Sequence, residues 1–152
     1  MNDEIIAIAG KIPHWVQTAL DDYLKRFSGH LCLKLLKPYR SKEKERVRRE
    51  EGKAILASLP ERAFMIALDE KGVLLNTHQL ASHLQQWQRQ VGMPLVFIVG
   101  GTEGLCPNVL AKASFTLSLS PLTLPHALAQ IVLVEQLYRA RCILSGHPYH
   151  RA

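Results

Sequence analysis

The sequence predicts a single α/β domain, with a mostly parallel sheet flanked by helices. Three observations support this. Short apolar runs alternate with longer amphipathic ones, apolar residues make up 47% of the 152 residues, and we find no linker, repeat or low-complexity segment. We therefore expect one domain over residues 1–152, which leaves little room for a separate substrate-binding domain.

Five short apolar segments have the length and composition of strands. The fourth, residues 95–99, is nearly all β-branched or aromatic, as expected of a central strand in a parallel sheet. The third ends at Asp69, where a polar segment of four residues begins. The five predicted strands are residues 5–9, 31–36, 64–68, 95–99 and 115–119.

Amphipathic segments between and after these strands predict helices. Pro13 suits the first turn of the first helix, and Gly146 suits the end of the last one. Asn76 can cap the third helix together with Gln79, three residues further on. The five predicted helices are residues 13–27, 41–53, 76–90, 107–113 and 126–145.

The formal net charge of +6 and the pI of about 9.4 are a moderate basic excess. Such a surface raises the local concentration of polyanions, either nucleic acid or acidic lipid. The densest charge run, residues 41–53, mixes six cations with four carboxylates. The mixed signs favour a solvated helix face, and a phosphate-facing edge is the alternative.

The three cysteines are far apart and odd in number, which indicates reduced thiols in a cytoplasmic protein. The acidic N-terminus does not resemble a signal peptide, and no apolar run has the length of a membrane span. We therefore expect no membrane partner. His147, His150 and Cys142 match no regular metal site, so no metal is expected.

Three segments of unusual composition follow predicted strands, after Leu68, Val99 and Leu119. In open α/β sheets, ligands bind at the carboxyl ends of the strands, so these segments form the best candidate site. Residues 100–104, G-G-T-E-G, match neither the dinucleotide fingerprint nor the P-loop. They are compatible with a close approach of backbone to ligand and equally with a tight turn.

The segment after Leu119 carries two prolines, which hold it extended and remove two backbone donors. Such a loop can read the edge of an adenine through its backbone while its leucines pack against the ring. The alternative is a stiff connection with its apolar residues turned inward. The segment consists of Ser120, Pro121, Leu122, Thr123, Leu124 and Pro125.

The last helix is apolar on more than one face, which favours burial against a second copy of the chain over burial within one chain. The tail after it carries His147, Tyr149, His150 and Arg151. These side chains suit an unpaired nucleotide, through stacking and phosphate contact. A frayed, solvated terminus is the alternative.

Five short motifs follow one another along the chain: K-I-P-H-W-V-Q at residues 11–17, G-G-T-E-G at 100–104, L-S-P-L-T-L-P-H at 119–126, E-Q-L-Y-R-A at 135–140 and H-P-Y-H-R at 147–151. In this order they resemble the RlmH family of SPOUT-class methyltransferases. Thr102 departs from the family pattern, in which proline is commonest at this position of the glycine loop.

The resemblance implies a SPOUT fold with a trefoil knot in the C-terminal half and a homodimer with cofactor sites beside its interface. It implies that S-adenosylmethionine contacts Leu68, Gly101 and residues 120–125. The implied reaction is methylation of N3 of a pseudouridine in a stem-loop of large-subunit (23S) ribosomal RNA, on the assembled ribosome.

The sulfonium methyl group is already activated, so alignment with the attacking nitrogen is the main requirement. Tyr149, His150 and Arg151 are the candidates for positioning the substrate, and Arg151 also for stabilising the developing anion. The N3 proton passes to His150, His147 or solvent.

Two other functions compete: a SPOUT methyltransferase acting on transfer RNA, and a non-enzymatic ribosome-binding factor. The intact glycine and proline loops favour an enzyme, and the small size favours the ribosome over transfer RNA.

Overall fold

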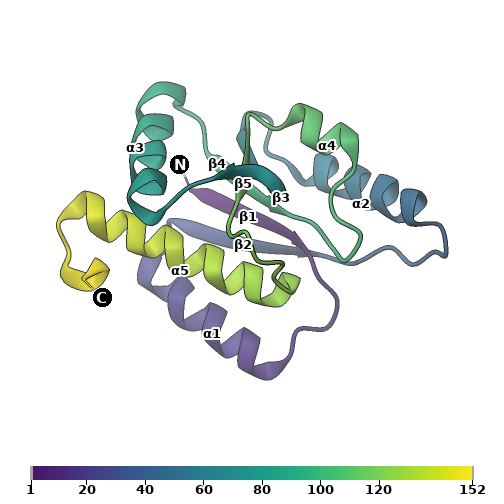
Figure 1. The fold of residues 1–152 in the computed structure, drawn as a ribbon, viewed down its shortest axis with the longest axis horizontal. Coiled ribbons are helices and arrows are strands. Elements are labelled where there is room, and N and C mark those ends of the chain that lie inside the picture. Colours follow the sequence, from purple (N-terminus) through teal and green to yellow (C-terminus); the bar gives the residue numbers. More distant parts are fainter. Residues whose placement is uncertain (1, 152) are drawn as a thin grey trace.

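The computed structural model describes residues 2–151, with the backbone alone at residue 91; residues 1 and 152 of the expected domain lie outside the described part. Its five strands are all parallel and form one sheet in the order β2-β1-β4-β3-β5 (Figure 1). The predicted parallel sheet is therefore confirmed. The strands are β1 (Asp3–Ile8), β2 (Leu31–Leu36), β3 (Phe64–Leu74), β4 (Leu95–Val99) and β5 (Phe115–Ser118).

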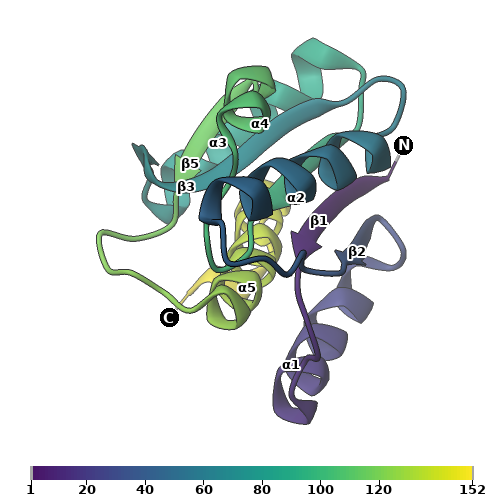
Figure 2. The same ribbon diagram turned by 90° about the vertical axis from the view of Figure 1, so that its right-hand side faces the viewer.

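Helices cover both faces of this sheet. Figure 2 shows α2 and α4 on one side and α1 and α5 on the other, and α3 packs beside α5. The predicted cap of α3 is confirmed, because the Asn76 side chain accepts from the backbone of Gln79. The helices are α1 (His14–Leu24), η1 (Lys25–Phe27), α2 (Lys44–Ser58), α3 (Thr77–Val91), α4 (Pro107–Lys112), α5 (His126–Ser145) and η2 (Pro148–His150).

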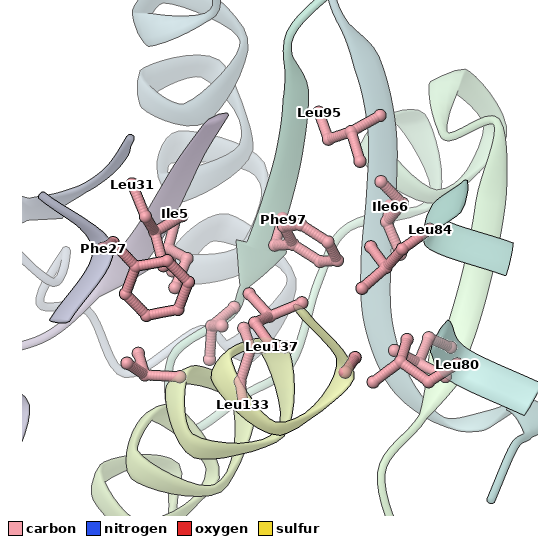
Figure 3. Packing of buried hydrophobic residues seen from close by; sticks show 14 of the residues in the cluster. Ile5, Phe27, Leu31, Ile66, Leu80, Leu84, Leu95, Phe97, Leu133 and Leu137 are labelled. Carbon is pink, nitrogen blue, oxygen red and sulfur yellow. The ribbon is translucent and has the colours of Figure 1, made fainter. Parts of the chain in front are cut away.

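Two apolar cores lie on the two faces of the sheet. Neighbouring residues of one strand point to opposite faces, so in β4 Phe97 joins one core while Val96 and Ile98 join the other. Figure 3 shows Phe97 and Ile66 against Leu137 of α5 and Leu84 of α3. Burial on both faces explains why these strands read as continuous apolar runs.

The third strand differs from its prediction. It was expected to end at Leu68, but β3 continues to Leu74 after a bulge, because Leu68 and Val73 both pair with Leu117 of β5. Residues 69–72 bulge out between these two pairings. The chain returns so close to β5 that a Cβ on Gly72 would lie 2.6 Å from the carbonyl oxygen of Thr116.

The second helix begins and ends later than predicted. It runs from Lys44 to Ser58, because Val47, Glu51 and Ile55 form its buried stripe and continue the helix past the charge run. The predicted first helix divides into α1 and the 3-10 helix η1. The bounds predicted for the last helix, and Gly146 as its left-handed C-cap at φ 78°, are confirmed.

Most of the apolar surface of α5 is buried within the chain. The helix packs between α1 and α3, with Leu133 and Leu137 fully buried against the sheet. Intrachain packing therefore accounts for the two-sided pattern that favoured a second copy. Leu128 and Leu144 stay exposed, at 39% and 38%.

The trefoil knot that the resemblance implies stays a prediction.

Among the helices of residues 2–151, none combines the length and hydropathy that crossing a bilayer requires.

Candidate cofactor cavity

A cavity of about 940 Å³ opens at the carboxyl ends of β3, β4 and β5. This is the edge of the sheet at which the three unusual segments were expected to meet, and all three contribute to its wall. Its volume is in the range of sites for cofactors and other small molecules. The wall also includes residues of α2, the start of α4 and the first turn of α5, namely Glu45, Arg48, Arg49, Pro107, Asn108, Leu110, His126 and Ala129.

The glycine loop forms one wall as a closed turn. The Gly104 amide donates to the carbonyl oxygen of Gly101 at 3.1 Å, and Gly104 has a φ of 78°, a left-handed conformation that favours glycine. A Cβ on Gly101 would lie 3.0 Å from Ile8 Cγ2 and 3.1 Å from Glu51 Oε1. Close packing beneath the loop therefore leaves little room for a side chain at 101, and a larger one would have to displace Ile8 or Glu51.

The proline loop and the β3 bulge form the opposite wall. Ser120, Leu122, Thr123 and Leu124 line the cavity, whereas Pro121 and Pro125 stand outside the lining. The loop is tied down at two points. The Leu122 amide donates to Ser120 Oγ at 2.9 Å, and the Thr123 hydroxyl donates to Glu70 Oε2 at 3.3 Å.

Six of the eight expected cofactor residues thus line one cavity: Leu68, Gly101, Ser120, Leu122, Thr123 and Leu124. Leu122 is 73% exposed and Leu124 is half-buried, so the loop does not turn both leucines into the core.

Charged side chains of both signs line the cavity. Arg48 and Arg49 of α2 line the cavity, and Arg48 Nη1 donates to the carbonyl oxygen of Glu103 in the glycine loop at 3.4 Å. Asp69 and Glu70 come from the bulge. A cavity with apolar walls and charges of both signs suits a ligand that is itself part apolar and part zwitterionic.

Sequence reasoning missed Glu51, which lies buried beneath the glycine loop at 4% exposure. Its Oε2 accepts from the Tyr39 amide at 3.0 Å, and its Oε1 has no hydrogen-bond partner among the described residues. Burial raises the pKa of this carboxyl above its ordinary value. The signal was present in the sequence, because Val47, Glu51 and Ile55 are spaced by four and share one helix stripe.

The C-terminal tail is ordered against its own chain. The Tyr149 hydroxyl hydrogen-bonds to the hydroxyl of Tyr23 at 3.2 Å and to Glu135 Oε1 at 3.3 Å, and its ring packs edge-on against Tyr138. Burial raises the pKa of Tyr149, and the hydrogen bond to Tyr23 adds to this. Residues 148–150 form a 3-10 helix and are not frayed.

None of Tyr149, His150 and Arg151 lines the cavity. The lining includes only the first turn of α5, up to Ala129, whereas the tail begins beyond Ser145, about 24 Å further along the helix axis. Figure 1 shows the C-terminus at the end of α5 remote from the proline loop. The structure therefore does not bring the expected catalytic residues together with the expected cofactor residues of the same chain.

Two solved structures share this fold. A probable methylase family protein from Haemophilus influenzae Rd KW20 superposes with a TM-score of 0.58 over 99% of this chain and 71% of that chain, at 13% identity. The SpoU methyltransferase AviRb from Streptomyces viridochromogenes, solved in complex with AdoMet, gives a TM-score of 0.50 over 92% of this chain and 58% of that chain, also at 13% identity. The chain thus has the fold of SPOUT methyltransferases.

The sequence then identifies the family. The family model described as "Predicted SPOUT methyltransferase" matches residues 1–150. "Ribosomal RNA large subunit methyltransferase H" of Stenotrophomonas maltophilia (strain R551-3) is 41% identical, and the alignment covers 100% of both chains. The chain belongs to the SPOUT methyltransferase family, as the motifs indicated.

Proposed function

We propose that this protein transfers a methyl group from S-adenosylmethionine to ribosomal RNA of the large subunit. The observation that carries the proposal is the 41% identity, over the full length of both chains, to a relative named as a large-subunit methyltransferase. The cavity at the carboxyl ends of the strands supplies a site of suitable size. The finer assignment is N3 of a pseudouridine on the assembled ribosome, in the cytoplasm.

The residues of the cavity fit the cofactor. Its adenine would lie against Leu68, Leu122 and Leu124, with the backbone of residues 120–125 reading the ring edge. The glycine loop at Gly101 would hold the methionyl part, since its tight packing on Ile8 and Glu51 keeps the loop backbone in place. When bound, the cofactor supplies a methyl group on a positively charged sulfur, already activated for transfer.

The chain's own residues then have to orient the nucleotide and handle one proton. The N3–H bond must break as the new N–C bond forms, and the proton passes to a histidine of the tail or to solvent. Arg151 would stabilise the negative charge that develops on the base. Its guanidinium is exposed and free of salt bridges within the described residues, so it is available to a ligand.

We infer further that the protein works as a homodimer in which the tail of one subunit serves the cavity of the other. The separation of tail and cavity along α5 supports this, since Tyr149 is held against its own chain. Large apolar side chains are also exposed at the carboxyl edge of the sheet: Trp15 at 58%, Leu122 at 73% and Leu128 at 39%. An apolar surface of this kind is typical of a subunit interface.

Sedimentation at micromolar concentration tests the dimer, which should have twice the 17.1 kDa chain mass. Mixing Gly101→Val and Arg151→Ala subunits then tests the shared site. Each homodimer should be impaired at both sites, whereas the mixed dimer keeps one intact site and should recover up to about half of the wild-type activity per dimer. An active monomer, or no recovery in confirmed mixed dimers, would overturn the shared site.

Mass spectrometry of ribosomal RNA from a deletion strain tests the reaction itself. The proposal expects loss of one methyl group from large-subunit RNA and its return on complementation. Methylation of transfer RNA in place of ribosomal RNA would favour the first alternative. An unchanged methylation pattern with defective ribosomes would favour the non-enzymatic factor.

A further inference from the structure

Most of the protein's excess positive charge is concentrated in one segment, residues 37–49, which joins β2 to α2 and includes the start of α2. It holds seven cations and two carboxylates, a net charge of +5 against +6 for the whole chain. The segment lies at the right of Figure 1, where α2 begins. The seven cations are Lys37, Arg40, Lys42, Lys44, Arg46, Arg48 and Arg49.

These cations are available to an external anion. Within residues 2–151, salt bridges occupy Lys25, Arg26, Lys34, Lys53 and Arg139, and none involves a cation of the 37–49 segment. Six of the seven side chains are exposed, and Arg48 is half-buried. Unpaired surface cations retain their field and release counterions when a polyanion binds.

The segment is held in place by buried and local contacts. The buried carboxylate of Glu51 accepts from the Tyr39 amide at 3.0 Å, and the Glu43 amide donates to Ser41 Oγ at 3.2 Å. The Arg46 guanidinium lies 5.8 Å from the centre of the Tyr39 ring, which is 37% exposed. A fixed backbone that presents cations and an accessible aromatic ring suits a nucleic-acid chain with unpaired bases.

The segment is also continuous with the cavity. Arg48 and Arg49, its last two cations, line the cavity wall, and Arg48 donates to the backbone of the glycine loop at Glu103. A polyanion lying along residues 37–49 would therefore pass beside the opening in which methyl transfer is proposed. This continuity favours RNA over an acidic protein or a lipid surface, because only the RNA substrate has to lie close to the site of methyl transfer.

We propose that residues 37–49 bind the sugar–phosphate backbone of the RNA substrate next to the target nucleotide. The inference rests on the proposed function and names the surface that engages the RNA. The bound phosphates position the RNA without reading its sequence. The target nucleotide is then presented at the cavity from the side of α2.

The test compares two triple variants with the same change of charge. Arg40→Gln, Lys42→Gln and Lys44→Gln neutralise the segment at exposed positions outside the cavity lining. The control changes Arg62, Arg89 and Lys112 to Gln. These three are also exposed, but they lie at the ends of loops and helices on the amino edge of the sheet.

Binding to purified large ribosomal subunits or whole ribosomes, whichever the wild type methylates, is measured from 50 to 300 mM KCl. The association constant K falls as the salt concentration rises, and each lost phosphate contact should make the slope of log K against log salt less negative by about 0.7–0.9. The slope of the segment variant should therefore be less negative than that of the wild type by about 2–3. The same relation predicts about 50–200-fold weaker binding near 150 mM salt. The control variant should keep the wild-type slope, and both variants should keep the wild-type affinity for S-adenosylmethionine.

Hydroxyl-radical footprinting of the bound RNA identifies the partner. Backbone protections that disappear in the segment variant and persist in the control variant support the inference. An unchanged salt slope in the segment variant, or an equal loss of ribosome affinity in both variants, would overturn the inference. An RNA footprint that is the same in the segment variant as in the wild type would also overturn it, because the segment would then contact a ribosomal protein and not the RNA. If the wild-type protein methylates no large-subunit RNA, the proposed function itself fails, and this is a separate result.

Discussion

The contact between α2 and α4 depends on Gly52, and its replacement by alanine makes a sharp prediction. Gly52 lies inside α2, where Gly→Ala normally stabilises a helix by about 1 kcal/mol. Here a Cβ would lie 2.3 Å from Cys106 Sγ and 3.4 Å from Val109 Cγ2. Overpacking of this kind costs about 1–3 kcal/mol, so Gly52→Ala should destabilise the protein by up to about 2 kcal/mol.

A double-mutant cycle with Cys106→Ala isolates the steric cost. Cys106 is 6% exposed, and removing its sulfur alone should cost about 1 kcal/mol through the space that it leaves. In the double variant the new methyl group occupies that space, so stability should return to near the wild-type value. The two substitutions should therefore couple by about 1–3 kcal/mol.

Urea unfolding of the wild type, the two single variants and the double variant measures this coupling. The stability difference between Lys53→Ala and Lys53→Gly, at the exposed neighbouring position, controls for the effect of helix propensity alone. Additivity within about 0.5 kcal/mol, together with a more stable Gly52→Ala protein, would refute the close-contact argument. Because Cys106 lies two residues after the glycine loop and also lines the cavity, Gly52→Ala should also weaken S-adenosylmethionine binding in calorimetry.

Three further predictions concern the cavity and the tail. Gly101→Val should weaken S-adenosylmethionine binding at least 10-fold in calorimetry and Gly101→Ala only a few-fold, because the larger side chain pushes the loop away from Ile8 and Glu51. Wild-type affinity in a folded Gly101→Val protein would mean that the cofactor binds elsewhere. Tyr149→Phe should lower the free energy of unfolding by about 1 kcal/mol through its lost hydrogen bonds; an unchanged value would mean that they contribute nothing. The pKa of Glu51 is higher in the folded state than in the unfolded state, so the folded state binds more protons. The free energy of unfolding should therefore fall as the pH rises from about 4.5, the unfolded value, to the higher pKa of the folded state. The pH profile of unfolding free energy should lose this fall in Glu51→Gln, and parallel profiles for the two proteins would contradict the assignment.

Elements with strong local signals could be predicted from the sequence. Strand β4 and helix α5 have the predicted bounds, because a run of β-branched residues and a long apolar helix closed by Gly146 need no information from elsewhere in the chain. The capping box at Asn76 is likewise a pattern within four residues. The expected meeting of three strand-end segments followed from the rule for parallel sheets.

The remaining features depend on contacts between distant segments. The bulge after Leu68 exists because β5 pairs with β3 twice, which a polar tetrapeptide does not reveal. Glu51 was hidden by its charged neighbours, although its spacing from Val47 was that of a buried stripe. The composition of the tail predicted a role toward the substrate, which stays a prediction. It could not reveal the partners of Tyr149 on α1 and α5, because only the fold brings these helices together.

The order of the strands in the sheet has a consequence for synthesis of the chain. Strand β1 pairs with β2 on one side, but its other neighbour is β4, whose residues 95–99 are made 59 residues after β2 ends. At about 5–20 residues per second, the inner edge of β1 waits roughly 3–12 s for its partner. During that time an apolar strand edge is open to pairing with other chains. The yield of folded protein should therefore fall when translation slows between residues 36 and 99 or when chaperones are limiting during that stretch.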